Sequence, residues 1–244
     1  MKKIILLLAF CPSVGNLFAQ DANADKLREE GDAAMTAKNY PEVVTKYSEY
    51  LKLTNYEDEG RVFNCAFAAY NAKKFDEAIK FYDMSIQKGY KTDDAYVGKA
   101  MSLRSQDNAA DFTATVEAGL KANAKNANLE KLLYAYCMKK GQAAQKAGKT
   151  EEAEELFKDV LVVSNPQYKG NALYSLGVMF YNAGAKILTE ANPIATSDPD
   201  KYAAEKKKAD AQMAKAKGYL EQAVALNAAD ANSKKILDAI NAAK

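Results

Sequence analysis

The sequence predicts an all-α protein, a solenoid of about five helix-turn-helix repeats. Three observations support this fold class. Small residues recur at nearly regular intervals, each of the first four is followed by mostly apolar residues twelve and sixteen positions later, and a short polar segment lies between the small residue and these later positions. The recurring small residues, spaced by 35, 34, 41 and 36 positions, are Gly31, Ala66, Ala100, Gly141 and Gly177. Such a period indicates stacked units, each burying its hydrophobic face against the next.

The matching positions lie twelve residues later (Val43, Ala78, Phe112, Ala153) and sixteen residues later (Tyr47, Tyr82, Val116, Phe157). In the fifth repeat they are Ala216 and Leu220, displaced by 27 inserted residues. Where two antiparallel helices cross at about 8–10 Å, we expect one small residue from each helix at the contact. The large residues would then fill the groove to the next repeat.

The polar segments KNYPE, AKKFDE, SQDNAAD and AGKTEE separate the two helices of the first four repeats. Pro41 suits a first helical position, and Thr150 is predicted to be an N-cap followed by Glu151 and Glu152. Within the fifth repeat, NPIATS predicts a loop, and Asp198-Pro199 predicts the start of a long helix. The two lengthened helices would project as a hairpin.

These positions set the expected domain limits. The solenoid covers residues 20–229, with repeats at about 24–57, 59–92, 93–126, 134–167 and 170–229 and an insertion at about 184–212. Residues 230–244 place Ile236, Leu237 and Ile240 on one face, which predicts a helix that caps the end of the stack.

Three stretches match one another best: GDAAMTAKNYPEVVTKYSEYLKL, AFAAYNAKKFDEAIKFYDMSI and GQAAQKAGKTEEAEELFKDVL. They resemble the tetratricopeptide repeat (TPR), with Tyr40 and Phe75 as the aromatic residue at the turn and Asn165-Pro166 closing the fourth repeat. The resemblance covers about residues 24–229 and extends to envelope proteins with a lengthened last pair. Phe112 stands where a small residue is expected, and no repeat has the early tryptophan of the family.

The N-terminus predicts export. Lys2 and Lys3 precede an apolar run at residues 4–10, and Leu17-Phe18-Ala19 offers a cleavage site, so residues 1–19 are predicted to be a signal peptide. The run is shorter than the about 20 residues of a membrane span. A second cleavage site at Ala22-Asn23-Ala24 and a lipid anchor on Cys11 are the alternatives, although Phe10 stands where lipoprotein motifs carry a small residue. The mature chain would be periplasmic or secreted.

Composition excludes several function classes. The chain has no histidine and no tryptophan, and two of its 34 basic residues lie in the signal peptide, which leaves 32 basic residues against 32 acidic ones. This balance does not favour nucleic acid or an anionic membrane as partner. No phosphate loop, zinc spacing or nucleophile motif is present, so we expect neither enzyme activity nor a metal or cofactor, with carboxylate-only chemistry as the formal exception.

The two cysteines of the mature chain are predicted to be buried free thiols. Cys65 and Cys137 fall on the first helices of repeats two apart, which a stack separates by roughly 20 Å. A disulfide requires Cα atoms within about 7 Å.

The TPR resemblance implies binding on a concave face lined by the first helices. Protein or peptide partners in the cell envelope are expected there, with glycan binding on the same tyrosine- and amide-lined surface as the alternative. Each residue could instead pack on a neighbouring helix. The hairpin could drive self-assembly, and Lys206–Lys208 is interpreted as a solvated helix face. The predicted groove residues are Phe63, Phe67, Tyr70, Asn71, Met101, Arg104, Met138, Gln142, Tyr174, Tyr181 and Asn182.

Overall fold

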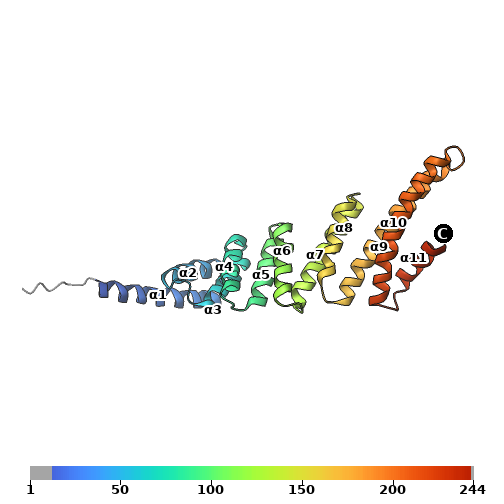
Figure 1. Cartoon of the computed structure of the whole chain (residues 1–244). Helices are drawn as coiled ribbons and strands as arrows, with labels where there is room; N and C mark the ends of the chain where they lie inside the picture. The colour runs from blue at the N-terminus through green and yellow to red at the C-terminus, as the bar shows by residue number, and fades with distance from the viewer. Residues whose placement is uncertain (1–12, 243–244) are drawn as a thin grey trace, which may run out of the picture. The chain divides into compact units, whose positions relative to one another are not determined.

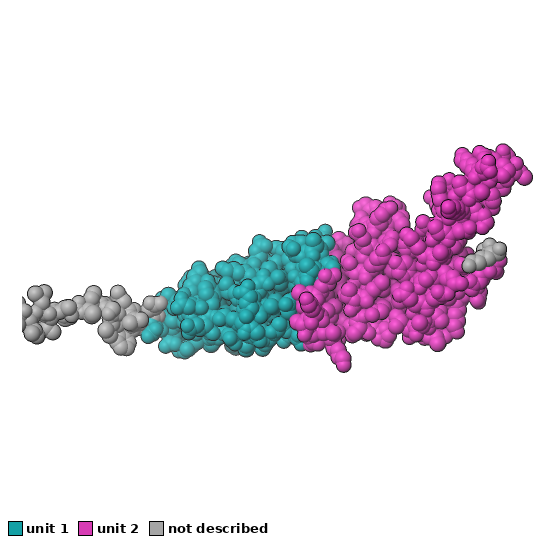
Figure 2. Space-filling view, in the orientation of Figure 1, with its two compact units in different colours: residues 1–115 teal, residues 116–244 magenta. Residues whose placement is uncertain are grey.

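The computed structural model describes residues 13–242, and all the regular secondary structure in this range is helical (Figure 1). The predicted all-α helix-turn-helix architecture is confirmed. The chain divides into two compact units, residues 1–115 (unit 1) and residues 116–244 (unit 2), shown in teal and magenta in Figure 2.

Unit 1 contains α1 (Ser13–Thr36), α2 (Tyr40–Leu53), α3 (Glu59–Asn71), α4 (Phe75–Gln87), α5 (Thr92–Ser105) and the first half of α6 (Ala109–Ala122). From α1 to α5, each helix packs against the next in sequence, and α3 also packs against α5. Tyr47, Leu51 and Val62 are fully buried between the helices. Each helix therefore supplies part of a continuous core.

Unit 2 contains the rest of α6, then α7 (Ala127–Lys146), α8 (Thr150–Asp159), the short 3-10 helix η1 (Val160–Val162) and α9 (Pro166–Ala191). The second 3-10 helix η2 (Asn192–Ile194) leads to α10 (Pro199–Leu226) and α11 (Ala231–Ala242). The ends of α9 and α10 that meet at η2 project from the rest of unit 2, and α11 packs on both helices (Figures 1 and 2). The predicted lengthened pair and capping helix are confirmed.

Asx side chains begin several helices. Asp58 accepts a hydrogen bond from the Arg61 backbone N–H at 3.0 Å, and Asp198 accepts one from the Lys201 N–H at 3.1 Å. Asn165 accepts from Gln167 N–H at 3.0 Å, so the Asn165-Pro166 pair that closes the fourth repeat also opens α9. These bonds satisfy N–H groups that a helix start leaves without backbone partners.

Two predicted helix starts are shifted by one residue. Thr150 is the first residue of α8, and the N-cap is Lys149, which makes no side-chain capping bond. The reason is local: Gly148, at φ +74°, ends the preceding turn, so Lys149 takes the non-helical capping position. Pro41 likewise occupies the second position of α2, behind Tyr40.

The small repeat positions are covered by large residues. A Cβ added to Gly31 would lie 2.4 Å from Tyr47 Cδ1, one on Gly141 would lie 2.6 Å from Phe157 Cε1, and one on Gly177 would lie 2.5 Å from Leu220 Cγ. The expectation that small residues face each other is therefore wrong at these three sites. The large side chain of the second helix lies directly over the glycine, because only glycine leaves room for it.

Part of the predicted signal peptide, including Lys2, Lys3 and Cys11, lies outside the described residues. Helix α1 begins at Ser13 and runs through both proposed cleavage sites. Among the described residues, no helix combines the length and the apolar character needed to span a bilayer.

Candidate functional site

Helix α3 in unit 1 carries two apolar faces. Val62, Cys65, Ala66 and Ala69 are fully buried and form its core face. A second stripe, which we call the α3 stripe, consists of Phe63, Phe67 and Tyr70 at positions i, i+4 and i+7. An ordinary surface helix would carry polar residues beside its core face.

Phe67 is the most exposed member of the α3 stripe. Its side chain remains 42% exposed, and its ring makes an edge-to-face contact with Tyr40 of α2 at a centroid distance of 5.9 Å. Asn71, one turn further on, is exposed and donates a hydrogen bond to the Phe67 carbonyl oxygen at 2.8 Å. A large ring and a side-chain amide therefore lie together at the surface of unit 1.

The other two aromatic residues of the α3 stripe are half-buried. The Phe63 ring lies edge-on to Tyr82 at 5.8 Å and to Tyr90 at 6.4 Å, and the Tyr70 ring lies 5.9 Å from Phe75. Both residues pack against the core of unit 1. They therefore hold the stripe in place and expose only part of their surface.

Helix α5 supplies the remaining predicted residues of unit 1. Met101 is half-buried and Arg104 is exposed. Because α5 packs against α3, the structure brings these two side chains into the same unit as the α3 stripe.

In unit 2, predicted residues lie on α7 and α9, which contact each other. Gln142 and Asn182 are exposed, and Tyr174 and Tyr181 are half-buried. Met138 is only 9% exposed, so the structure places it in the core instead of on a binding surface. A single groove through the residues of both units remains a prediction.

A ring stack connects α7 to α9. Tyr134 and Tyr168 lie parallel with centroids 4.3 Å apart, and the Asn171 amide donates to the Tyr134 hydroxyl at 2.8 Å. These contacts fix the N-terminal half of α9, which carries both Asn171 and Tyr174.

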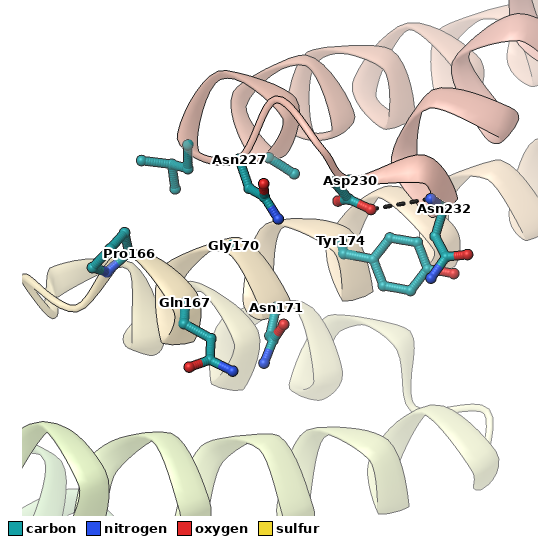
Figure 3. Close-up of a pocket in the computed structure, with 10 residues that line it drawn as sticks. Pro166, Gln167, Gly170, Asn171, Tyr174, Asn227, Asp230 and Asn232 are labelled. Atoms are coloured by element: carbon teal, nitrogen blue, oxygen red, sulfur yellow. Dashed lines mark hydrogen bonds between the residues drawn. The ribbon is translucent and has the colours of Figure 1, made fainter.

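Unit 2 also contains a pocket of about 460 Å³ where α9 meets the end of α10 and the start of α11 (Figure 3). Of the predicted residues, only Tyr174 lines it. The segment LNAADAN contributes three further Asn and Asp residues. This Asx-rich segment could have indicated the pocket from the sequence, but it does not fall at the recurring repeat positions. The pocket is lined by Pro166, Gln167, Gly170, Asn171, Tyr174, Ala223, Leu226, Asn227, Asp230 and Asn232.

The carboxylate in this pocket is already engaged. Asp230 accepts hydrogen bonds at 3.1 Å from the backbone N–H groups of Asn232 and Ser233, and the Ser233 hydroxyl donates to it at 2.5 Å. Asp230 thus caps the N-terminus of α11. None of the described residues lining the pocket is lysine or arginine.

A charged cluster in unit 1 joins the first three helices. The Arg61 guanidinium donates to Asp32 at 2.6 Å and to Asp58 at 2.7 Å, and it lies over the rings of Tyr47 and Tyr50 at 5.9 and 5.7 Å. Burial opposes ionisation of Asp58, but the hydrogen bonds from Arg61 outweigh it and lower the Asp58 pKa below its usual value. The cluster ties α1 to α3.

Cys65 and Cys137 are both buried and free, which confirms the prediction. Burial raises the pKa of each thiol to about 12, so neither forms the nucleophilic thiolate at neutral pH. Among residues 13–242, no group of three or more Cys, Asp or Glu side chains is arranged to hold a metal ion.

Comparison with known proteins shows the family. No protein-family model and no curated protein matches the chain. A crystal structure of a TPR repeats protein from Bacteroides fragilis is 44% identical, with a TM-score of 0.85, covering 91% of this chain and 99% of that one.

Two more distant structures also align. The TPR domain of P58(IPK) is 12% identical with a TM-score of 0.46, covering 93% of this chain and 67% of that one. The TPR2AB domain of yeast Sti1, solved in complex with pHSP90, is 14% identical with a TM-score of 0.36, covering 90% and 97%. On the strength of the B. fragilis relative, and in agreement with its helix pairs, the chain belongs to the tetratricopeptide repeat proteins.

Proposed function

We propose that this TPR protein is an exported scaffold that binds a protein or peptide partner through the first-helix faces of its repeats and performs no chemistry of its own. TPR proteins generally mediate protein–protein or peptide binding. In this proposal the mature chain begins after Ala19 and acts in the cell envelope, as the basic and apolar N-terminal residues suggest.

The exposed ring of Phe67 is the observation that carries the proposal. Helix α3 already buries a complete core face, with Phe63 and Tyr70 packed beside it, whereas Phe67 keeps 42% of its side chain exposed. Burying a side chain of this size against a partner contributes roughly 1.5–3 kcal/mol. An aromatic ring held in place by Tyr40 and flanked by half-buried rings is the kind of anchor that dominates interfaces.

Exposed polar residues also lie on the first helices of both units. Asn71, Gln142 and Asn182 are exposed amides, and each can donate to and accept from the backbone of an extended peptide. Arg104, on α5, adds one exposed positive charge to unit 1. We expect a partner with an apolar side chain for Phe67 and an extended segment beside it.

The absence of histidine and the raised thiol pKa values support a binding role over a catalytic one. A cysteine nucleophile must be ionised near the working pH, and histidine is the commonest general base.

The test is selection of peptides from a displayed random library on the purified protein, followed by affinity measurement on two variants. Phe67→Ala is expected to weaken binding of the selected peptides at least tenfold, which corresponds to about 1.4 kcal/mol. Val162→Ala is the matched control, because Val162 is 53% exposed in η1 and lies off the proposed surface. Equal affinity of wild type and Phe67→Ala would reject the α3 stripe as the binding surface.

A further inference from the structure

We propose that the pocket between α9, α10 and α11 binds a neutral sugar residue, either free or at the end of a glycan. This site lies in unit 2 and shares no residue with the α3 stripe in unit 1, so it stands or falls independently of peptide binding at that stripe. Its volume of about 460 Å³ lies in the roughly 300–1,000 Å³ range of small-molecule pockets.

The pocket wall is rich in side-chain amides. Gln167 and Asn171 come from α9, Asn227 follows the end of α10, and Asn232 comes from the first turn of α11 (Figure 3). Each amide offers one acceptor oxygen and two donor hydrogens. Sugar hydroxyl groups also donate and accept, so neighbouring hydroxyls on one ring match such a wall.

Two of these amides are oriented by the protein itself. The Asn171 amino group donates to Tyr134, which leaves its carbonyl oxygen as an acceptor for a ligand. The Asn227 carbonyl oxygen accepts from the Ala229 N–H at 3.0 Å, which leaves its amino group as a donor, and Figure 3 shows this side chain extending from the end of α10 toward α9. One acceptor and one donor are therefore fixed before a ligand arrives, which lowers the entropy cost of binding.

Apolar groups complete the pocket. Tyr174 contributes its ring, with Asn232 beside it in Figure 3, and Leu226 remains 41% exposed at the end of α10. A pyranose ring has C–H groups on its faces and hydroxyls around its edge. The C–H faces pack on an aromatic ring, whose π face is negative, or on an aliphatic side chain.

The charge of the pocket selects against anionic ligands. The described lining contains no lysine or arginine, and the Asp230 carboxylate is occupied by the α11 N-terminus. A peptide carboxylate, a phosphate or an acidic sugar would lose hydration here without gaining a counter-ion. The chemistry therefore favours an uncharged, hydroxyl-rich ring over the carboxylate end of a peptide.

Gly170 gives a direct way to close the pocket. It lines the pocket within α9, and a Cβ added to it would have no atom within 4 Å, so a side chain there would extend into open space. Gly218, in α10, is likewise open within 4 Å and does not line the pocket, which makes it the matched control.

The experiment is titration of the full chain with glucose, galactose, mannose, N-acetylglucosamine and the disaccharides lactose and cellobiose, followed by amide NMR shifts and calorimetry. We expect at least one of these sugars to bind with a millimolar dissociation constant and to shift the amides of residues 167–174 and 227–232. Gly170→Leu should weaken this binding at least tenfold, whereas Gly218→Leu should preserve it. Glucuronate should bind more weakly than glucose.

Asn232→Ala is a second variant. It removes one side-chain amide from the pocket and keeps the backbone N–H that donates a hydrogen bond to Asp230. Asn232→Ala should also weaken sugar binding, so the proposal can still be tested if Gly170→Leu does not fold properly. The proposal is overturned if none of the named neutral sugars binds, if both pocket variants bind like wild type, or if a library-selected peptide occupies residues 167–174. If Phe67→Ala loses peptide binding but keeps sugar binding, the sugar site is supported and is independent of the α3 stripe. If the protein binds peptides through Phe67 but binds none of the sugars, the sugar site alone is rejected.

Discussion

The Tyr47 ring lies against the backbone of Gly31, so close that a Cβ on Gly31 would lie 2.4 Å from Tyr47 Cδ1. The ring is 2% exposed, and its hydroxyl donates to Asp32 at 2.6 Å. The Tyr47 side chain therefore contacts Gly31 through its ring and Asp32 through its hydroxyl. This pair fixes the distance between α1 and α2.

Gly31→Ala is expected to lower the free energy of unfolding by about 1–3 kcal/mol, because the buried ring must shift to make room for the methyl group. Gly218→Ala is the control: that glycine is open and lies within α10, so alanine should raise the free energy of unfolding by up to about 1 kcal/mol. Urea denaturation measures both. A stable Gly31→Ala variant would show that the ring can move freely.

Arg61→Met is expected to cost about 1–2 kcal/mol of stability, because it removes the charged bonds to Asp32 and Asp58 at a half-buried site. The lowered pKa of Asp58 means that its contribution is complete above the usual pKa of 3.8 and is lost as the pH falls through the folded-state pKa. Acid denaturation followed by circular dichroism should therefore be less steep in Arg61→Met. Arg61→Lys should restore only part, since lysine lacks the forked donor geometry.

Asp159→Asn is expected to stabilise the protein near neutral pH. Burial, reinforced by the charges of Glu117 and Glu155, raises the Asp159 pKa from 3.8 to about 6. The folded state then binds the proton more tightly than the unfolded state, so the stabilisation from protonated Asp159 is complete below pH 3.8 and is lost as the pH rises through about 6. Thermal unfolding should show Asp159→Asn above wild type at pH 7 and no advantage near pH 4. Asp238→Asn is the control, because the Asp238 side chain on α11 is exposed. An equal gain in stability in that variant would contradict the prediction.

Glu130→Ala is expected to loosen the start of α9. Glu130 is 4% exposed and accepts hydrogen bonds from the backbone N–H groups of Ser164 and, at 3.2 Å, Asn165. Without it, these groups lose their acceptor at a cost of about 1–3 kcal/mol. Hydrogen exchange should accelerate at residues 164 and 165 first, and Glu130→Gln should be milder because it retains an acceptor oxygen. Unchanged exchange in the alanine variant would contradict the assignment.

The fold could be predicted because its cause is periodic. In the first, fourth and fifth repeats a large residue of the second helix packs over a glycine of the first helix, and the spacing of sixteen residues between Gly31 and Tyr47 recurs between Gly141 and Phe157. The side chain that contacts each glycine could not be predicted, because spacing alone does not distinguish the residue twelve positions later from the one sixteen positions later. Thr150 shows a similar limit: capping chemistry identifies a helix start only to within a residue.

The candidate sites were less predictable. Helical spacing placed Phe63 and Phe67 on one stripe, but their different exposure depends on Tyr82 and Tyr40, which other helices bring to them. The sugar pocket combines Asn171 with Asn232, sixty-one positions apart, only because α11 folds back onto α9. No repeat position encodes that junction.

Binding through the aromatic face of α3 is tested most directly by photo-cross-linking in cells that produce the protein, with p-benzoylphenylalanine replacing Phe67 in one strain and Val162 in another. We expect a discrete adduct to a protein partner from position 67, in the exported fraction, and none from position 162, although both sites are exposed. Equal labelling from the two positions, or no adduct from position 67, would contradict the claim that the aromatic face of α3 is where this protein binds.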